Sequence, residues 1–209
     1  MKKISVFILF IVFCGAAGAQ GMASIFSSMP DRMIEPVDSI LRLDIIDLYN
    51  AGRSPQIINH FGDTARLVAL EDNYLQFQSG NLTLEIASLP MINDSKVIGV
   101  IKTVCAPVCD SRVLFFTTEW KPLDPGVFIN PVAWDWFISE GVDRDNEYFK
   151  TVESALDMEL MQFSFDNNGL SLVQTYNTPQ YLSIDLRASA GKYLKKESKR
   201  YTWNKVRFE

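Results

Sequence analysis

The stretch that decides the fold is Lys96–Lys121, KVIGVIKTVCAPVCDSRVLFFTTEWK. Its two halves, Val97–Val104 and Arg112–Trp120, are rich in β-branched and aromatic residues and hold no proline, which is typical of strands. Ala106–Val108, between the two cysteines, has the length of a short hairpin loop. We therefore predict a β-hairpin with this loop at its tip.

Folding the strands about that loop sets one cross-strand register. Cys105 then lies opposite Cys109, and directly opposed residues have Cα atoms roughly 4.5–5.5 Å apart, within reach of a disulfide. Nearer the base, Ile101 falls opposite Val113, and both faces of the hairpin are apolar there. We expect the base to be buried on both sides and the tip to carry a disulfide.

The two cysteines favour a structural disulfide. Their C-x-x-x-C spacing differs from the C-x-x-C of thioredoxin-like enzymes, and no βαβ pattern surrounds them. A labile or regulatory disulfide is the alternative. A metal site would need further Cys or His ligands, and the only histidine, His60, is far away in the sequence. We predict neither a metal nor a cofactor.

One pair in this register is unfavourable. Lys102 falls opposite Arg112, and like charges directly opposed destabilise a sheet. Three explanations stay open: Asp110 relieves the pair diagonally, the register is shifted by one residue, or the two side chains hold an anion. Lys102 and Arg112 are thus a candidate anion contact, although most charged tips are only solvated.

The first residues predict export. Met1–Lys3 is basic, Ile4–Phe13 is apolar apart from one serine, and Ala17–Ala19 resembles a signal-peptidase site. The apolar core is too short to span a membrane. We predict a secretory signal peptide over residues 1–19, and the oxidising compartments that it leads to allow a disulfide to persist.

Lipoprotein processing at Cys14 is the alternative fate of this leader. Phe13 precedes that cysteine, whereas lipoprotein sites have a small residue there, so we expect no lipid anchor at Cys14. Removal of Cys14 with the leader leaves two cysteines, so no thiol remains unpaired if they form a disulfide.

Charge and composition exclude some partners. The 209 residues are 47% hydrophobic and 22% charged, as in ordinary globular proteins. The 20 basic residues less Lys2 and Lys3 leave 18, against 25 acidic ones, a net charge of −7 after the leader. A negative chain is a poor partner for nucleic acid or an anionic membrane surface. No segment after the leader has the length and apolarity of a transmembrane span.

The rest of the chain predicts helices among many strands. We expect a flexible N-terminal arm over residues 20–33 and a single domain over residues 34–209. An amphipathic helix should follow Pro36 and end near Gly52, and a turn with a short helix containing His60 comes next. Strands are predicted before and after the central hairpin, at Ala65–Leu70, Tyr74–Gln78, Leu82–Leu89, Leu156–Phe165, Leu170–Tyr176 and Tyr201–Phe208.

Two further stretches complete the expected fold. A charged, solvent-facing segment covers Gly141–Lys150, and a helix runs from Thr178 to about Leu194. The order of these elements predicts an α+β fold. Its sheet should be largely antiparallel, with about eight strands and the disulfide-tipped hairpin at its centre, and two or three helices should pack on it.

An aromatic cluster is a candidate contact surface. Trp134, Trp136 and Phe137 lie in the short apolar segment Val132–Ile138. They either cap an open end of the core or form an exposed platform for a ligand or glycan.

No catalytic set is visible. The sequence has no Gly-rich phosphate loop, G-x-S-x-G or H-E-x-x-H motif, so we predict no catalytic residue. Asp38, Asp44 and Asp47 fit a solvated helix face better than a paired-acid or cation site.

Several segments together match one family. They are Leu43–Tyr49, Asn59–Gly62, Asp72–Leu75, Thr103–Ser111, Phe116–Lys121 and Thr178–Leu182. On these residues the chain resembles domain-of-unknown-function family 3256, secreted proteins of Bacteroidales, over nearly all of the chain after the leader. The resemblance implies a Gram-negative envelope location, in the periplasm or associated with the outer membrane. It carries no activity, cofactor or catalytic residue.

The same resemblance suggests a modification. Asp38–Ile40 and Asp63–Ala65 are similar to the short Asp-Ser/Thr-apolar acceptor sites for O-glycans in such bacteria. Ser39 and Thr64 are therefore candidate acceptors.

Three functions remain open. We favour a non-enzymatic binding or accessory module for an unknown envelope protein or glycan. The second is an envelope-acting hydrolase that uses carboxylates and His60, which requires His60 and an acid within hydrogen-bond reach in a concave pocket. The third is thiol redox chemistry at Cys105 and Cys109.

Overall fold

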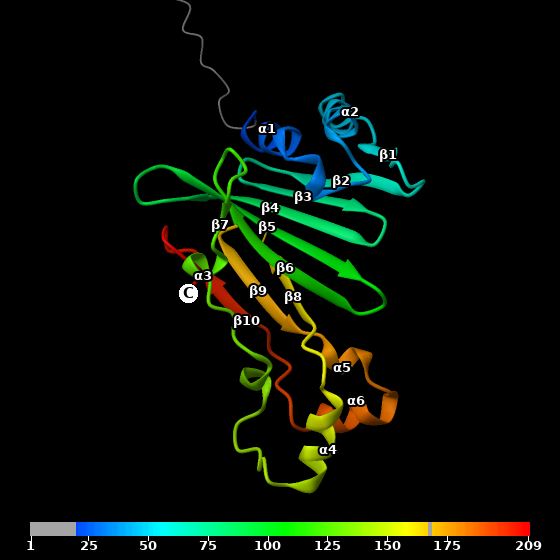
Figure 1. The fold of residues 1–209 in the computed structure, drawn as a ribbon, viewed down its shortest axis with the longest axis vertical. Coiled ribbons are helices and arrows are strands. Elements are labelled where there is room, and N and C mark those ends of the chain that lie inside the picture. Colours follow the sequence, from blue (N-terminus) through cyan, green and yellow to red (C-terminus); the bar gives the residue numbers. More distant parts are fainter. Residues whose placement is uncertain (1–19, 167–168) are drawn as a thin grey trace, which may run out of the picture.

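The computed structural model describes residues 20–166 and 169–209. The predicted leader, with Cys14, lies outside these residues. The described chain forms two antiparallel sheets, one of seven strands and one of three, instead of the one sheet expected (Figure 1). The α+β class is confirmed.

The large sheet is a meander in which each strand pairs with the next one along the chain. Its strands are β1 (Gln56–Ile58), β2 (Thr64–Leu70), β3 (Tyr74–Ser79), β4 (Leu82–Pro90), β5 (Lys96–Cys105), β6 (Cys109–Phe116) and β7 (Pro122–Leu123). The small sheet contains β8 (Met161–Phe165), β9 (Ser171–Tyr176) and β10 (Lys199–Thr202), in the order β10-β9-β8.

The central hairpin has the predicted register. Ile101 pairs with Val113 and Cys105 with Cys109, and a disulfide joins the two cysteines, whose Cα atoms are 3.9 Å apart. Ile101 is fully buried, as expected for the base. The second arm ends at Phe116, because a turn closed by the hydrogen bond from the Thr117 N–H to the Lys121 carbonyl oxygen leads the chain back along β6 as β7.

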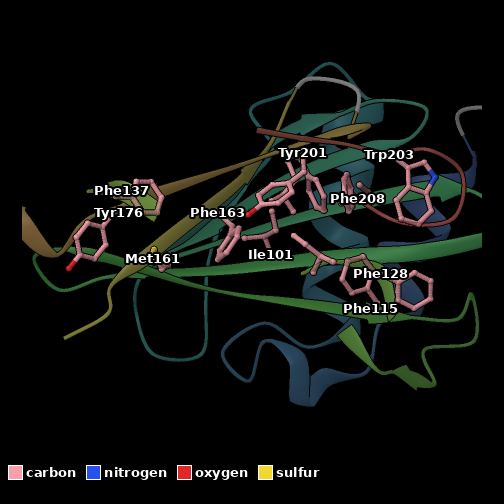
Figure 2. Packing of buried hydrophobic residues seen from close by; sticks show 14 of the residues in the cluster. Ile101, Phe115, Phe128, Phe137, Met161, Phe163, Tyr176, Tyr201, Trp203 and Phe208 are labelled. Carbon is pink, nitrogen blue, oxygen red and sulfur yellow. The ribbon is translucent and has the colours of Figure 1, made fainter. Parts of the chain in front are cut away.

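Strand alternation gives the large sheet two buried faces. On one face, side chains such as Phe77, Leu84 and Ile86 pack under the N-terminal helices. On the other face, Ile101 and Phe115 join the small sheet and the C-terminal part of the chain. Figure 2 shows that second cluster, in which aromatic rings from β6, β8, β9, β10 and the connecting segments meet.

The N-terminal cover corrects one expectation. Where we expected a flexible arm, the chain forms α1 (Gln20–Ser28) and a 3₁₀ turn, Asp31–Met33. Met22 and Phe26 are fully buried, because their i, i+4 spacing points both side chains at the large sheet. Helix α2 (Ser39–Asn50) follows and begins after the N-cap Asp38 instead of at Pro36.

A buried arginine ties this cover together. The Arg42 side chain on α2 is fully buried and donates to the carbonyl oxygens of Val37 at 2.9 Å, Ser27 at 3.4 Å and Met29. Its ion pair with Asp31 at 3.0 Å involves a half-exposed carboxylate. The guanidinium therefore serves mainly the backbone between α1 and α2.

The predicted short helix at His60 is wrong. The chain forms β1 and then a turn, in which the Asn59 side-chain oxygen accepts from the N–H groups of Phe61 and Asp63. Such a side-chain acceptor favours a turn over a helix.

The C-terminal half has more helix than expected. Its helices are α3 (Pro125–Phe128), α4 (Glu147–Ala155), α5 (Thr178–Tyr181) and α6 (Ile184–Ala190). Gly141–Lys150 is mostly exposed, as expected, but its last residues, Glu147–Lys150, belong to helix α4, which was not predicted. The single long helix predicted after Thr178 is broken between α5 and α6, where Leu182 is extended. Arg187 holds this break by donating to the carbonyl oxygens of Pro179, Gln180 and Leu182.

Side chains of the large sheet hold the small one. Strand β8 pairs with β9 on one side only, and its outward N–H groups alternate along the strand. The N–H of Met161 donates to Asp110 Oδ1, that of Phe163 to Ser111 Oγ and that of Phe165 to Glu85 Oε2, each at 3.0 Å.

Candidate functional site

The aromatic segment divides into a core residue and two surface residues. It forms a 3₁₀ turn, Trp134–Phe137. Phe137 is only 2% exposed and stacks on Tyr176 with ring centroids 5.5 Å apart. Phe137 therefore caps the core, as one of the two predicted readings required, and is removed from the contact surface. Trp134 and Trp136 are half-buried.

Two lysines cover the ring of Trp136. The Lys195 ammonium lies 4.4 Å from the ring centroid and that of Lys199 lies 5.7 Å away. Lys195 also donates to the Trp136 carbonyl oxygen at 2.8 Å. These cation–π contacts fix the ring in place.

A concave surface adjoins this segment, and we call it the Trp134 cleft. It has a volume of about 440 Å³ and is lined by Asp110, Ser111, Pro131, Val132, Ala133, Glu159, Met161, Phe163 and Gln174. Glu159 Oε1 accepts from the N–H of Trp134 at 2.9 Å, and Asp110 Oδ1 accepts from that of Met161. One oxygen of each carboxylate is therefore anchored by backbone.

Buried polar groups hold the wall of the cleft. Gln174 is fully buried and donates from Nε2 to the Val132 carbonyl oxygen at 2.7 Å, while its Oε1 accepts from the Tyr201 hydroxyl at 2.7 Å. Burial raises the pKa of Tyr201, so its hydroxyl stays neutral. The wall at Val132 is thus held in place by side chains of β9 and β10.

The structure decides between two of the explanations for the opposed charges at the hairpin tip. Lys102 and Arg112 do pair across the strands, so the shifted register is wrong. Asp110 faces the backbone of β8 instead of relieving them, and within the described residues no acid lies within 4.0 Å of either cation. The anion contact stays a prediction.

His60 and Asp38 form a surface pair. The His60 Nε2 atom lies 3.0 Å from Asp38 Oδ2, with side-chain exposures of 54% and 35%. Asp38 Oδ1 caps α2 by accepting from the N–H of Leu41, and this bond, with the contact to His60, lowers the pKa of Asp38. The pair fastens the β1–β2 turn to α2, and neither residue lines the cavities described here.

Glu85 is a buried acid that the sequence did not reveal. Its Oε2 accepts from the Tyr74 hydroxyl at 2.9 Å and from the N–H of Phe165. Burial raises the pKa of Glu85, and burial with the neighbouring carboxylate raises that of Tyr74. Perturbed acids often mark functional sites, but this one is enclosed between the two sheets.

The candidate O-glycan acceptors lie on the N-terminal side of the molecule. Ser39 is the first residue of α2 and is half-buried, and Thr64 is exposed at the start of β2.

The α4–α6 cavity was missed from the sequence. It is a hollow of about 330 Å³ between these two helices. The signal for α4 was present, because Phe149, Val152 and Leu156 recur at helical spacing after the N-cap Asn146. The charged residues between Gly141 and Lys150 conceal this signal, because they are typical of a solvent-facing segment.

Within residues 20–166 and 169–209, no three His, Cys, Asp or Glu side chains gather as metal ligands would. In the same residues, no helix has the length and apolarity needed to cross a bilayer.

Comparison with known proteins agrees with the resemblance read from the sequence. No curated protein matches this chain. A similar solved structure is that of a domain of an uncharacterized protein from Porphyromonas gingivalis W83, with 26% identity and a TM-score of 0.81. The match covers 90% of this chain and 98% of that one. The profile of the family described as "Protein of unknown function (DUF3256)" matches residues 15–208. This chain belongs to the DUF3256 family.

Proposed function

We propose that this chain is an exported, non-enzymatic binding or accessory protein of the cell envelope. Its contact surface is the Trp134 cleft together with Trp134 and Trp136. The observation that supports this is the cleft itself, a hollow of about 440 Å³ whose polar groups are held by backbone and by buried Gln174. Concave surfaces with a few fixed polar groups are the usual form of binding sites.

The chemistry of the cleft suits a ligand that donates hydrogen bonds. Its charged lining residues, Asp110 and Glu159, are both acids. Each has one oxygen anchored by an N–H, so the other can accept from a ligand. Met161 and Phe163 supply apolar surface. The hydroxyls of an envelope glycan or the amines of an envelope protein fit this set.

The test is capture by the immobilised mature chain, with solubilised envelope proteins and purified envelope glycans as separate probes. We expect one probe to be retained, and retention to fall at least about tenfold in Trp134→Ala with Trp136→Ala, as for loss of a binding hot spot. Asp110→Asn with Glu159→Gln keeps the anchored acceptors but removes both charges, and it should weaken capture as well.

Ile92→Ala is the matched control, since Ile92 is an exposed apolar residue, 72% accessible, in the β4–β5 turn. Unfolding midpoints show whether each variant is folded. Capture that is unchanged in both the tryptophan and the carboxylate variants would remove this surface from the proposal.

Export is part of the proposal. The amino-terminal pattern and the Cys105–Cys109 disulfide support it, because such bonds persist in oxidising compartments. Fractionation should find the chain in the periplasm or with the outer membrane, and mass spectrometry should find Gln20 as its first residue. A lipid on Cys14, or an uncleaved cytosolic chain, would contradict this.

The two alternatives have direct tests. Thiol chemistry at Cys105 and Cys109 would be ruled out by a reduction potential below about −300 mV, the range of structural disulfides. The hydrolase alternative is supported only by the His60–Asp38 contact at 3.0 Å. It predicts that His60→Ala abolishes any hydrolysis of envelope glycans that the chain performs.

Two smaller proposals concern single sites. Lys102 and Arg112, adjacent cations without an acidic partner in the described residues, are proposed to contact an anion. Ser39 and Thr64 are proposed to carry O-glycans, which intact mass measurement of Ser39→Ala and Thr64→Ala would detect.

A further inference from the structure

The α4–α6 cavity has the size and shape of a small-ligand site. Its volume is about 330 Å³, within the range of roughly 300–1,000 Å³ that is common for ligand pockets. Helix α4 contributes Tyr148, Thr151 and Val152, whose i, i+3, i+4 spacing places them on one face. The opposite wall comes from α6 and the turn that follows it, with Leu186, Lys192 and Tyr193.

The walls of the cavity are anchored in the core. Phe149 is fully buried and Val152 is 3% exposed, which holds α4 against the second hydrophobic cluster. Ala190 is fully buried and holds α6 in the same way. The rings of Phe149 and Tyr193 meet edge to face, with centroids 5.5 Å apart. The cavity is therefore preformed and does not depend on mobile loops.

The charge on the lining of the cavity is positive. Among the described residues that line the cavity, Lys192 is the single cation and none is an acid. Within the part of the chain that the structure describes, no carboxylate lies within 4.0 Å of Lys192. Lys150, on the outer side of α4, differs because it contacts Asp145 at 3.9 Å and Glu147 at 3.5 Å.

The remaining lining is apolar or hydroxylic. Val152 and Leu186 are aliphatic, and the rings of Tyr148 and Tyr193 add aromatic surface. Thr151 Oγ1 already donates to the Glu147 carbonyl oxygen at 2.9 Å, so it offers no competing charge or donor. An apolar body with one negative end matches both parts of this lining, because its charge can pair with the Lys192 ammonium at the mouth of the cavity.

We propose that the α4–α6 cavity binds a small amphipathic carboxylate, of the class of medium-chain fatty acids and aryl carboxylates. The carboxylate pairs with the Lys192 ammonium, and the alkyl or aryl body lies on Val152, Leu186 and the two tyrosine rings. This site is separate from the Trp134 cleft, so neither proposal depends on the other.

The test compares three probes with one alkyl chain and different heads. Octanoate, octanol and octylamine are titrated into the full mature chain by calorimetry, below the concentrations at which they aggregate. We expect saturable binding of octanoate, about threefold to fivefold tighter than of octanol, since an ion pair with an exposed lysine contributes up to about that factor. Octylamine should bind most weakly.

Variants assign the binding to this cavity. Lys192→Gln should abolish the preference for octanoate and leave octanol binding unchanged, and Leu186→Ser should weaken both. Lys150→Gln is the matched control on the outer side of α4 and should change nothing. Lys192 is exposed, so its variant is expected to fold. Equal binding of octanoate and octanol, retained preference in Lys192→Gln, or no saturable binding by any probe would overturn the proposal.

Discussion

The two faces of the large sheet are covered in opposite ways. On the N-terminal side, the Arg42 guanidinium donates hydrogen bonds to backbone carbonyl oxygens of the covering segment. On the other side, Asp110, Ser111 and Glu85 accept hydrogen bonds from backbone N–H groups of β8. One cover is thus held by a buried donor and the other by acceptors.

This difference has a physical consequence. An arginine stays charged at any ordinary pH, so the contacts that Arg42 makes within the N-terminal cover should respond little to acid or base. Carboxylates titrate, and Glu85 lies buried between the sheets without a cation within 4.0 Å in the described residues. The small sheet should therefore respond to pH.

The largest effect is expected from Arg42→Met. The change leaves the carbonyl oxygens that Arg42 serves without their donor, and each unsatisfied buried group costs about 1–3 kcal/mol. We expect a loss of at least about 3 kcal/mol in the free energy of unfolding, measured with denaturant. The loss should be similar at all pH values.

Asp31→Asn is the control for Arg42. It removes only the charge of a half-exposed partner, and such surface pairs contribute less than about 1 kcal/mol. An equal loss in both variants would mean that the ion pair, and not the backbone contacts, holds the N-terminal cover.

The second effect comes from the disulfide. Cys105→Ser with Cys109→Ser opens a loop whose ends are 4 residues apart, which corresponds to about 2 kcal/mol in the chain-entropy model. Because the same tip carries Asp110 and Ser111, hydrogen exchange should rise at the Met161 and Phe163 amides. Faster exchange in α1 instead would contradict the separation of the two covers.

Glu85→Gln tests the pH response. Burial raises the pKa of Glu85 above its ordinary value of 4.5. The folded state therefore holds the proton more tightly, and the stability that this gives is lost as pH rises through the raised pKa. Glutamine keeps an oxygen acceptor for Tyr74 and Phe165 without a charge.

We expect Glu85→Gln to be more stable than the parent chain near about pH 8, by about 1–3 kcal/mol, the range for imperfectly compensated buried polar groups. The difference should shrink as pH falls toward 4.5. Denaturant unfolding across this range measures it, and a difference that does not change with pH would refute the assignment.

The smallest effect is expected from Ser111→Ala, about 1 kcal/mol, because the Phe163 N–H loses its acceptor. Ser88→Ala is the matched control. The Ser88 hydroxyl is buried without a hydrogen-bond partner among the described residues, so its removal should be neutral or stabilising. A larger loss in Ser88→Ala than in Ser111→Ala would contradict the role given to Ser111.

Local patterns predicted the hairpin well. The β-branched residues of Val97–Val104 predicted a strand, and the opposed cysteines predicted the β5–β6 register. These signals lie within a few residues of each other. The predicted strands Leu156–Phe165 and Leu170–Tyr176 are also present, as β8 and β9, although β8 begins later than expected, at Met161.

Features that depend on contacts between distant residues were not predicted from the sequence. An arginine in a helix is expected at the surface, and Arg42 is buried because its carbonyl acceptors come from Ser27 and Met29, before α2. The division of the strands into two sheets was not predicted for the same reason, since β8 is held by Glu85, 80 residues earlier. The α4–α6 cavity lies between two helices. Helix α4 was not predicted, and α6 was predicted as part of one long helix together with α5.

The row of hydrogen bonds along β8 also bears on self-association. Unpaired strand edges act as templates for strands of other chains. The Met161, Phe163 and Phe165 amides are already engaged by side chains, so a neighbouring molecule cannot extend the small sheet from this side without first displacing them. Any growth of this protein into fibres would have to start elsewhere.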